Sequence, residues 1–112
     1  MILKNLTRKT VLATDLKIPT SVLDQTLGLL KKSQPRSLLL KTRFGIHTFG
    51  LKEDIDVAIL DKDFKIVKLK ESLKPNSLFF WNPKYSLVIE LPKETLKKTK
   101  TSLGCLLELK ML

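Results

Sequence analysis

Only one cysteine, Cys105, and one histidine, His47, occur among the 112 residues. A lone cysteine cannot close an intramolecular disulfide, and the pair cannot supply all four ligands of a Cys/His zinc site. No apolar run approaches the roughly 20 residues that a membrane-spanning helix needs. Residues 1–9 carry charges where a secretory signal has its apolar centre. We therefore expect a cytoplasmic protein with no metal and no other cofactor.

Arginine is scarce, although the chain is basic. The net charge is +10, and only Arg8, Arg36 and Arg43 among the 21 basic residues are arginines. Clustered cations gain affinity for phosphate by releasing counterions, but bidentate recognition of phosphate favours arginine over lysine. The lysines are also spread along the whole chain. We interpret them mainly as a solvated surface, with nucleic acid or an anionic surface as an alternative partner.

Length and composition predict one globular domain over residues 1–112. The hydrophobic content is 43%, and the mean hydropathy is zero, as in soluble proteins with a single core. Short alternating segments predict strands, and the run around Ile55, Val57 and Ile59 is apolar on both sides, as in a central strand. Residues 65–70 are its expected hairpin partner. The remaining predicted strands cover residues 12–18, 37–41, 85–91 and 103–109.

One helix is expected near the amino end. Ser21 and Asp24 resemble a capping box, and apolar residues then recur at helical spacing until the helix fades by Lys32. Residues 94–98 offer at most a helical turn. Six or so short strands with one helix favour a mainly β fold, either a β-sandwich or a compact barrel-like sheet.

Several short motifs occur in order along the chain. They are Gly28-Leu29-Leu30, His47-Thr48-Phe49-Gly50-Leu51, Ile55-Asp56-Val57, Leu60-Asp61 and Ile89-Glu90-Leu91-Pro92. Their order and spacing resemble the uncharacterised family called domain of unknown function 192, in its His-Thr-Phe-Gly branch. The resemblance covers roughly residues 12–109 and implies a small, sandwich-like β domain, but it implies no reaction.

The chain departs from that family pattern at several positions. Leu30 and Leu51 replace methionines, and Cys105 occupies the place of an aspartate. Any role that depends on that aspartate is therefore in doubt here. Further departures are Glu53-Asp54 for Phe-Pro, Phe64 for Gly and Lys93-Glu94 for Ala-Gly.

His47 and Asp56 form the first candidate pair. A carboxylate can fix the tautomer of an imidazole and raise its basicity, as general acid-base catalysis requires. No nucleophile completes the pattern, so a hydrogen-bonded structural pair is the main alternative. Thr48 and Phe49 belong to the same candidate ligand-binding site. Glu90 could join the pair at one end of the sheet, where the three side chains could hold a divalent cation.

An aromatic segment supplies a second candidate surface. Phe79, Phe80, Trp81 and Tyr85 lie beside a predicted turn. If exposed, they could bind a partner; otherwise they cap the open end of the core.

These patterns favour a ligand-binding or protein-interaction module, with a site near His47 and Asp56, over an enzyme. The alternative is a hydrolase or metal-assisted enzyme that uses His47, Asp56 and Glu90. A basic binder of nucleic acid or an anionic surface is the third hypothesis. The partner is a protein or a small molecule under the first hypothesis, and the sequence does not name it.

Overall fold

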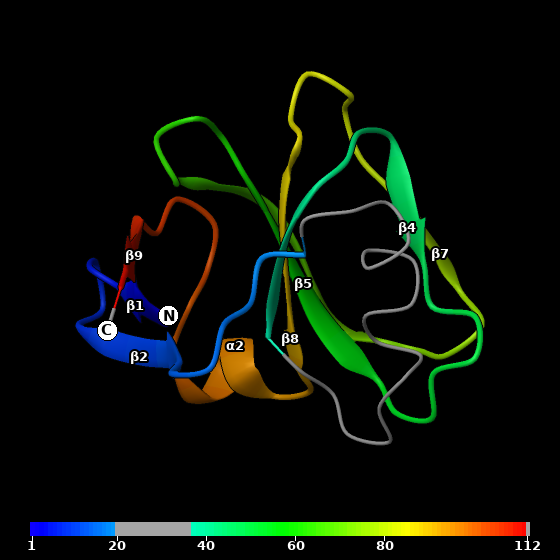
Figure 1. The fold of residues 1–112 in the computed structure, drawn as a ribbon, viewed down its shortest axis with the longest axis horizontal. Coiled ribbons are helices and arrows are strands. Elements are labelled where there is room, and N and C mark those ends of the chain that lie inside the picture. The colour runs from blue at the N-terminus through cyan, green and yellow to red at the C-terminus, as the bar shows by residue number, and fades with distance from the viewer. Residues whose placement is uncertain (20–36, 112) are drawn as a thin grey trace.

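The computed structural model describes residues 1–19 and 37–111, and these residues form a mainly β fold (Figure 1). They build three antiparallel sheets, with strand orders β2-β1-β9, β3-β8-β5-β6 and β4-β7. The elements are β1 (Ile2–Asn5), β2 (Thr10–Ala13), β3 (Leu38–Lys41), β4 (Gly45–His47), β5 (Ile55–Leu60), β6 (Ile66–Leu73), β7 (Leu78–Phe80), β8 (Leu87–Pro92), α2 (Thr95–Lys98) and β9 (Leu107–Lys110).

The four-stranded sheet is the centre of the fold because both of its faces are covered. All six residues of β5 are buried, and β5 pairs with β6 on one side and β8 on the other. Successive residues of β5 point to opposite faces. One face belongs to a first core that also takes in β1, β2 and β9, and the other face belongs to a second core. The first core includes Leu3, Leu12, Leu39, Ala58, Leu60, Ile89, Leu91, Leu96 and Leu107, and the second includes Leu38, Leu40, Ile55, Val57, Ile59, Leu73, Trp81 and Val88.

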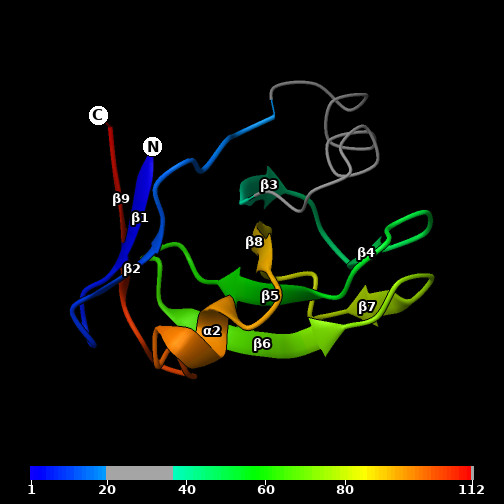
Figure 2. The same ribbon diagram turned by 90° about the horizontal axis from the view of Figure 1, so that it is seen from below.

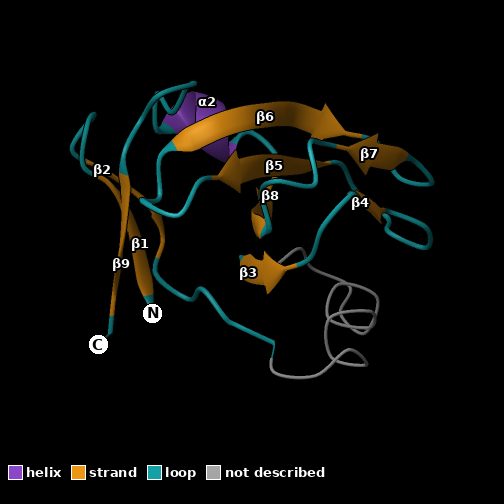
Figure 3. Ribbon diagram, turned by 90° about the horizontal axis from the view of Figure 1, so that it is seen from above, coloured by secondary structure: helices purple, strands orange, loops and turns teal. Residues whose placement is uncertain are grey.

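The two small sheets lie at opposite ends of the central sheet. Figures 2 and 3 show β1, β2 and β9 at one end and the pair β4 and β7, here called the ribbon, at the other. Ile46 and Phe79 of the ribbon pack against the second core. Within residues 1–19 and 37–111, the central sheet is open, with β3 and β6 as its outer strands. The architecture is therefore a set of packed open sheets, and the barrel alternative is wrong.

Several predicted elements are confirmed. Residues 55–60 form a central strand with β6 as hairpin partner, residues 38–41 form β3, and residues 95–98 form one helical turn. The first and last strands are shorter than predicted, since β2 ends at Ala13 and β9 begins at Leu107. The predicted helix at residues 21–32 lies outside the described residues. The helix that the structure does describe, α2, lies in the carboxyl-terminal half.

The described chain forms a compact unit. The Cα radius of gyration is 12.7 Å, close to the ~13 Å of a single domain of about 100 residues. Within residues 1–19 and 37–111, no helix has the length and apolar character to cross a membrane.

Candidate functional site

His47 ends β4 and lies on the surface of the ribbon. Its ring stacks on Phe49, with 4.9 Å between ring centroids and 23° between planes. The backbone N–H of Phe49 donates a 3.3 Å hydrogen bond to Nδ1 of His47. The neutral imidazole therefore carries its hydrogen on Nε2, which leaves that atom as a donor. His47 is exposed, so it is available to a binding partner.

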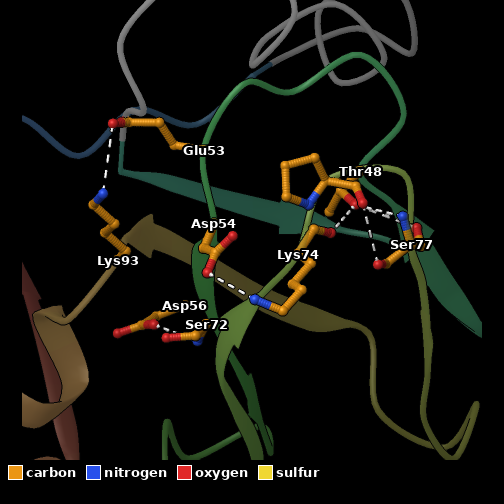
Figure 4. A network of polar contacts seen from close by, with 9 residues as sticks. Thr48, Glu53, Asp54, Asp56, Ser72, Lys74, Ser77 and Lys93 are labelled. Carbon is orange, nitrogen blue, oxygen red and sulfur yellow. Dashed lines mark hydrogen bonds and ion pairs between the residues drawn. The ribbon is translucent and has the colours of Figure 1, made fainter.

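Thr48, the next residue, is buried and holds two loops together (Figure 4). Its hydroxyl donates to the carbonyl oxygen of Lys74 at 2.6 Å and accepts from the N–H of Ser77 at 2.8 Å. The N–H of Gly50 adds a 3.3 Å bond to the side-chain oxygen of Asn76. Thr48 therefore fixes the loop that carries Phe49, and its own hydroxyl is occupied within the chain.

We expect Thr48→Val to destabilise the fold by about 1–3 kcal/mol, because the N–H of Ser77 and the carbonyl of Lys74 lose their shared partner. Urea unfolding followed by the fluorescence of Trp81 measures this change. Thr14→Val, at an exposed position, is the control and should change stability by less than about 0.5 kcal/mol. Equal stabilities of the two variants would contradict the role given to Thr48.

Asp56 is fully buried on β5 and binds two backbone amides from distant elements. Oδ1 accepts from the N–H of Ser72, and Oδ2 accepts from the N–H of Leu96, both at 2.9 Å. Ser72 lies where the β5–β6 register shifts, and its φ is +54°. Leu96 lies in the first turn of α2, whose preceding residue, Glu94, forms no side-chain cap. The carboxylate thus supplies the missing cap of α2 and anchors the irregular part of β6.

Glu90 lies on β8, on the face of the central sheet opposite to that of Asp56. It pairs with Leu38 and Val57, whereas Asp56 pairs with Leu91. Glu90 is only 3% exposed, and in the part of the chain that the structure describes Oε2 has no hydrogen-bond partner. Burial raises the pKa of Glu90 from 4.5 to about 7, because the charged form loses its hydration.

The predicted grouping of His47, Asp56 and Glu90 is not formed. Each residue lies in a different environment: His47 is exposed on the ribbon, Asp56 is bonded to amides beside the first core, and Glu90 faces the second core. Over residues 1–19 and 37–111, no three His, Cys, Asp or Glu side chains come together as a metal site. The separation of Asp56 from Glu90 follows from strand alternation. Glu90 pairs with Val57, the neighbour of Asp56, so the two carboxylates point to opposite faces of the sheet.

Three of the four predicted patch residues belong to the core. Trp81 is buried, and its Nε1 donates to the carbonyl of Tyr85 at 2.9 Å. Phe79 and Tyr85 are half-buried against the second core. Only Phe80 is exposed, at 60%. The cluster is therefore mainly a cap of the core, which was the alternative stated from the sequence.

A different set of residues forms an exposed apolar region on the ribbon and beside it, and we call it the aromatic surface. Phe44 is 65% exposed, Phe49 is 49% exposed and Leu78 is 56% exposed. Because directly paired residues share a face, Leu78 lies beside His47, and Phe80 lies beside Gly45. Sequence reasoning missed β4 and β7, and with them Phe44 and Leu78. The aromatic surface consists of Phe44, His47, Phe49, Leu78 and Phe80.

The comparisons with known proteins identify relatives over most of the chain. No family model matches. The chain is 30% identical to the UPF0127 protein PH1112 of Pyrococcus horikoshii over 96 residues. The match covers 80% of this chain and 83% of that protein. A crystal structure from Sinorhizobium meliloti, named as a candidate transcription regulator, has a TM-score of 0.80 and 19% identity, and the match covers 96% of this chain and 89% of that one.

A second crystal structure, of a protein of unknown function from Novosphingobium aromaticivorans, has a TM-score of 0.78 with 9% identity. That match covers 96% of this chain and 82% of the other. At such identities the two structures establish the fold and nothing more. The relative from Pyrococcus horikoshii carries the family assignment, because its identity to this chain extends over most of both proteins. This chain belongs to the UPF0127 family of uncharacterised proteins.

Proposed function

We propose that the protein is a binding module without catalytic activity, and that the aromatic surface is where it binds. The observation that carries this proposal is the concentration of exposed rings on the ribbon and on the residues that flank β4. Phe44, Phe49 and Phe80 are each about half exposed or more. Single exposed apolar residues are ordinary in soluble proteins, but a contiguous group is typical of an interaction site.

The backbone at Phe44 supports this proposal. Its φ is +76°, and the N–H of Gly45 donates to the carbonyl of Arg43 at 3.0 Å. These two features match a classic γ-turn, which is rare and strained. A bulky residue in this region costs about 1–3 kcal/mol, and such strain concentrates at functional sites. The backbone of Phe44 is therefore unfavourable for stability, and its exposed ring gains little from burial in return.

The enzyme alternative has less support. Among the described residues, both carboxylate oxygens of Asp56 are bonded to backbone amides, and neither His47 nor Glu90 shares its environment. The surface around His47 offers stacking and hydrogen-bond donation, which suit binding. Two narrower assignments remain proposals: membership of the family of domain of unknown function 192, which the sequence motifs support, and a cytoplasmic location.

We expect Phe44→Gly to abolish or strongly weaken binding while leaving stability unchanged or raising it by up to about 1 kcal/mol, because glycine adopts positive φ without strain. Binding is measured by NMR titration with three probes: an oligothymidylate, polyglutamate and vesicles of phosphatidylglycerol. At least one probe should shift the amide resonances of residues 44–50 and 78–81.

Leu103→Ser is the matched control, since Leu103 is 63% exposed at a position outside the aromatic surface. It should bind as the unmodified protein does. The proposal fails if none of the three probes shifts those amides, or if the shifts fall on β1, β2 and β9 instead. It also fails if Phe44→Gly and Leu103→Ser bind equally well.

A further inference from the structure

We infer that the aromatic surface binds single-stranded nucleic acid, an inference that rests on the binding function proposed above. A strand of unpaired bases needs two features from a protein that binds it without strict sequence preference. One is a set of exposed rings on which bases stack, and the other is a group of cations that follow the phosphates. The ribbon and its flanking loops present both.

The rings are held in place before any partner binds. A Cβ atom at Gly45 would lie 2.5 Å from Cδ1 of Phe80, so the ring of Phe80 lies directly over the glycine. His47 and Phe49 already form a stacked pair at 4.9 Å, and their loop is fixed by Thr48. Binding therefore orders few side chains, which preserves affinity.

The charges around these rings are positive. The ribbon and the loops on either side of it, residues 41–54 and 74–86, contain more cations than carboxylates: Lys41, Arg43, Lys52, Lys74 and Lys84 against Glu53 and Asp54. The strand β6 contributes Lys68, whose Nζ donates to the carbonyl of Phe80 at 2.9 Å and lies 5.0 Å from the ring centroid of Phe79. The same strand contributes Lys70 and one acid, Glu71.

The carboxylates that follow the ribbon in sequence are paired with lysines. Asp54 lies 3.8 Å from Lys74 and Glu53 lies 3.6 Å from Lys93, measured between charged atoms (Figure 4). These pairs lie beyond the His47 end of β4. At the Phe44 end, two backbone hydrogen bonds join the flanking loops, from Thr42 to Ser86 and from Trp81 to Phe44. This junction brings the loop of Arg43 beside the loop of Lys84, and neither loop, residues 42–44 and 81–86, contains a carboxylate.

Single strands fit this combination better than the other anionic partners. In a duplex the bases are stacked on one another and paired, so their faces are not available to the rings. Acidic polypeptides would engage the cations but would leave the rings without stacking partners, and anionic lipid would bury the rings without stacking on them. Three of the four exposed apolar residues on the surface are phenylalanines and only Leu78 is aliphatic, which favours stacking over aliphatic packing.

The test is fluorescence anisotropy with a labelled oligothymidylate of about 20 nucleotides, longer than the footprint of one small domain. Comparison probes of equal length are an abasic strand, which keeps the phosphates and lacks bases, and the corresponding duplex. We expect the oligothymidylate to bind at least tenfold more tightly than either. Between 50 and 200 mM salt, its log affinity should fall against log salt with a slope of about −2, for roughly three neutralised phosphates.

Variants locate the binding. Phe80→Ser should weaken binding between about fivefold and a hundredfold, the usual effect of removing one stacking ring, and Leu103→Ser should leave it within twofold. The double variant Arg43→Gln with Lys84→Gln should make the salt slope shallower. Lys62→Gln with Lys97→Gln removes the same charge from exposed positions outside the ribbon and should leave the slope unchanged.

Three results would overturn the inference. The first is equal binding of the abasic strand, the duplex and the oligothymidylate, and the second is an equal effect of the two charge-removing pairs. The third is tighter binding of polyglutamate or phosphatidylglycerol vesicles at the same amides, which would refute nucleic acid but leave the binding module intact. If no probe shifts those amides, the proposed function fails together with the inference.

Discussion

Replacing Asp56 with alanine is expected to lower the free energy of unfolding by about 3–5 kcal/mol. The carboxylate makes two charge-assisted hydrogen bonds, each worth about 1.5–3 kcal/mol, to the N–H groups of Ser72 and Leu96. The bond to Leu96 is buried, so the freed N–H has no access to compensating water. A domain of this size has only about 5–15 kcal/mol of stability, so this single change should remove a large part of it.

Urea unfolding followed by the fluorescence of Trp81 measures the effect. Trp81 is the single tryptophan of the chain and is buried in the second core, so its fluorescence reports the loss of that core. Asp56→Asn should also destabilise, since its amide nitrogen would face one of the two N–H donors that the carboxylate accepts from. Asp63→Ala is the matched control, because Asp63 is exposed and should change stability by less than about 0.5 kcal/mol.

Hydrogen exchange gives a second measurement of the same contact. In Asp56→Asn, the amides of Ser72 and Leu96 should exchange faster than amides in the middle of β8. A fall in stability below 1 kcal/mol for Asp56→Ala, with unchanged exchange at those amides, would show that the carboxylate does not anchor α2 and β6.

The burial of Asp56 could be predicted from the sequence, whereas its partners could not. Strand alternation places Asp56 on a covered face with Ala58 and Leu60, so a need for hydrogen-bond donors follows. The donors are 16 and 40 residues away. They depend on the register shift in β6 and on the position of α2, which local patterns do not specify. His47, the nearby candidate in sequence, lies in a different sheet.

The strands were predictable in proportion to their length and burial. β5 has six residues and is apolar on both faces, so its central position was evident. β4 and β7 have three residues each, which is too short for alternation to be recognised. The sequence does not predict β1 either, because its two inward-facing residues are Leu3 and the polar Asn5, which give no apolar alternation. The sequence therefore predicts His47, Phe49 and Phe80 as candidate site residues, in two separate groups, and only the coordinates join them with Phe44 and Leu78 in one surface.

The ionisation of Glu90 should make stability fall as the pH rises. The pKa of Glu90 is 4.5 in the unfolded chain and about 7 in the folded protein. Below pH 4.5 both states are protonated, and there is no penalty. Between these values the unfolded state loses its proton while the folded state keeps it, so the folded state becomes relatively less stable by up to about 1.4 kcal/mol per pH unit. Above pH 7 the penalty levels off at roughly 3 kcal/mol.

Glu90→Gln should remove this dependence, because glutamine stays neutral at every pH. The variant and the unmodified protein should be similarly stable at pH 4, and the variant should be more stable by up to about 3 kcal/mol at pH 8. Urea unfolding in steps from pH 4 to pH 8 measures the difference. Glu71→Gln, at an exposed position on β6, controls for removal of one surface charge and should show no comparable trend.

The difference between the two proteins is the decisive quantity, since all other titrating groups contribute equally to both. A difference that grows with pH would establish that the Glu90 carboxyl enters the second core as a neutral acid, next to Leu38 and Val57. A difference that is constant from pH 4 to pH 8 would instead show that the carboxylate is solvated or paired in the folded protein. The unsatisfied Oε2 atom would then have a partner in solution, and burial would no longer be the cause of a raised pKa.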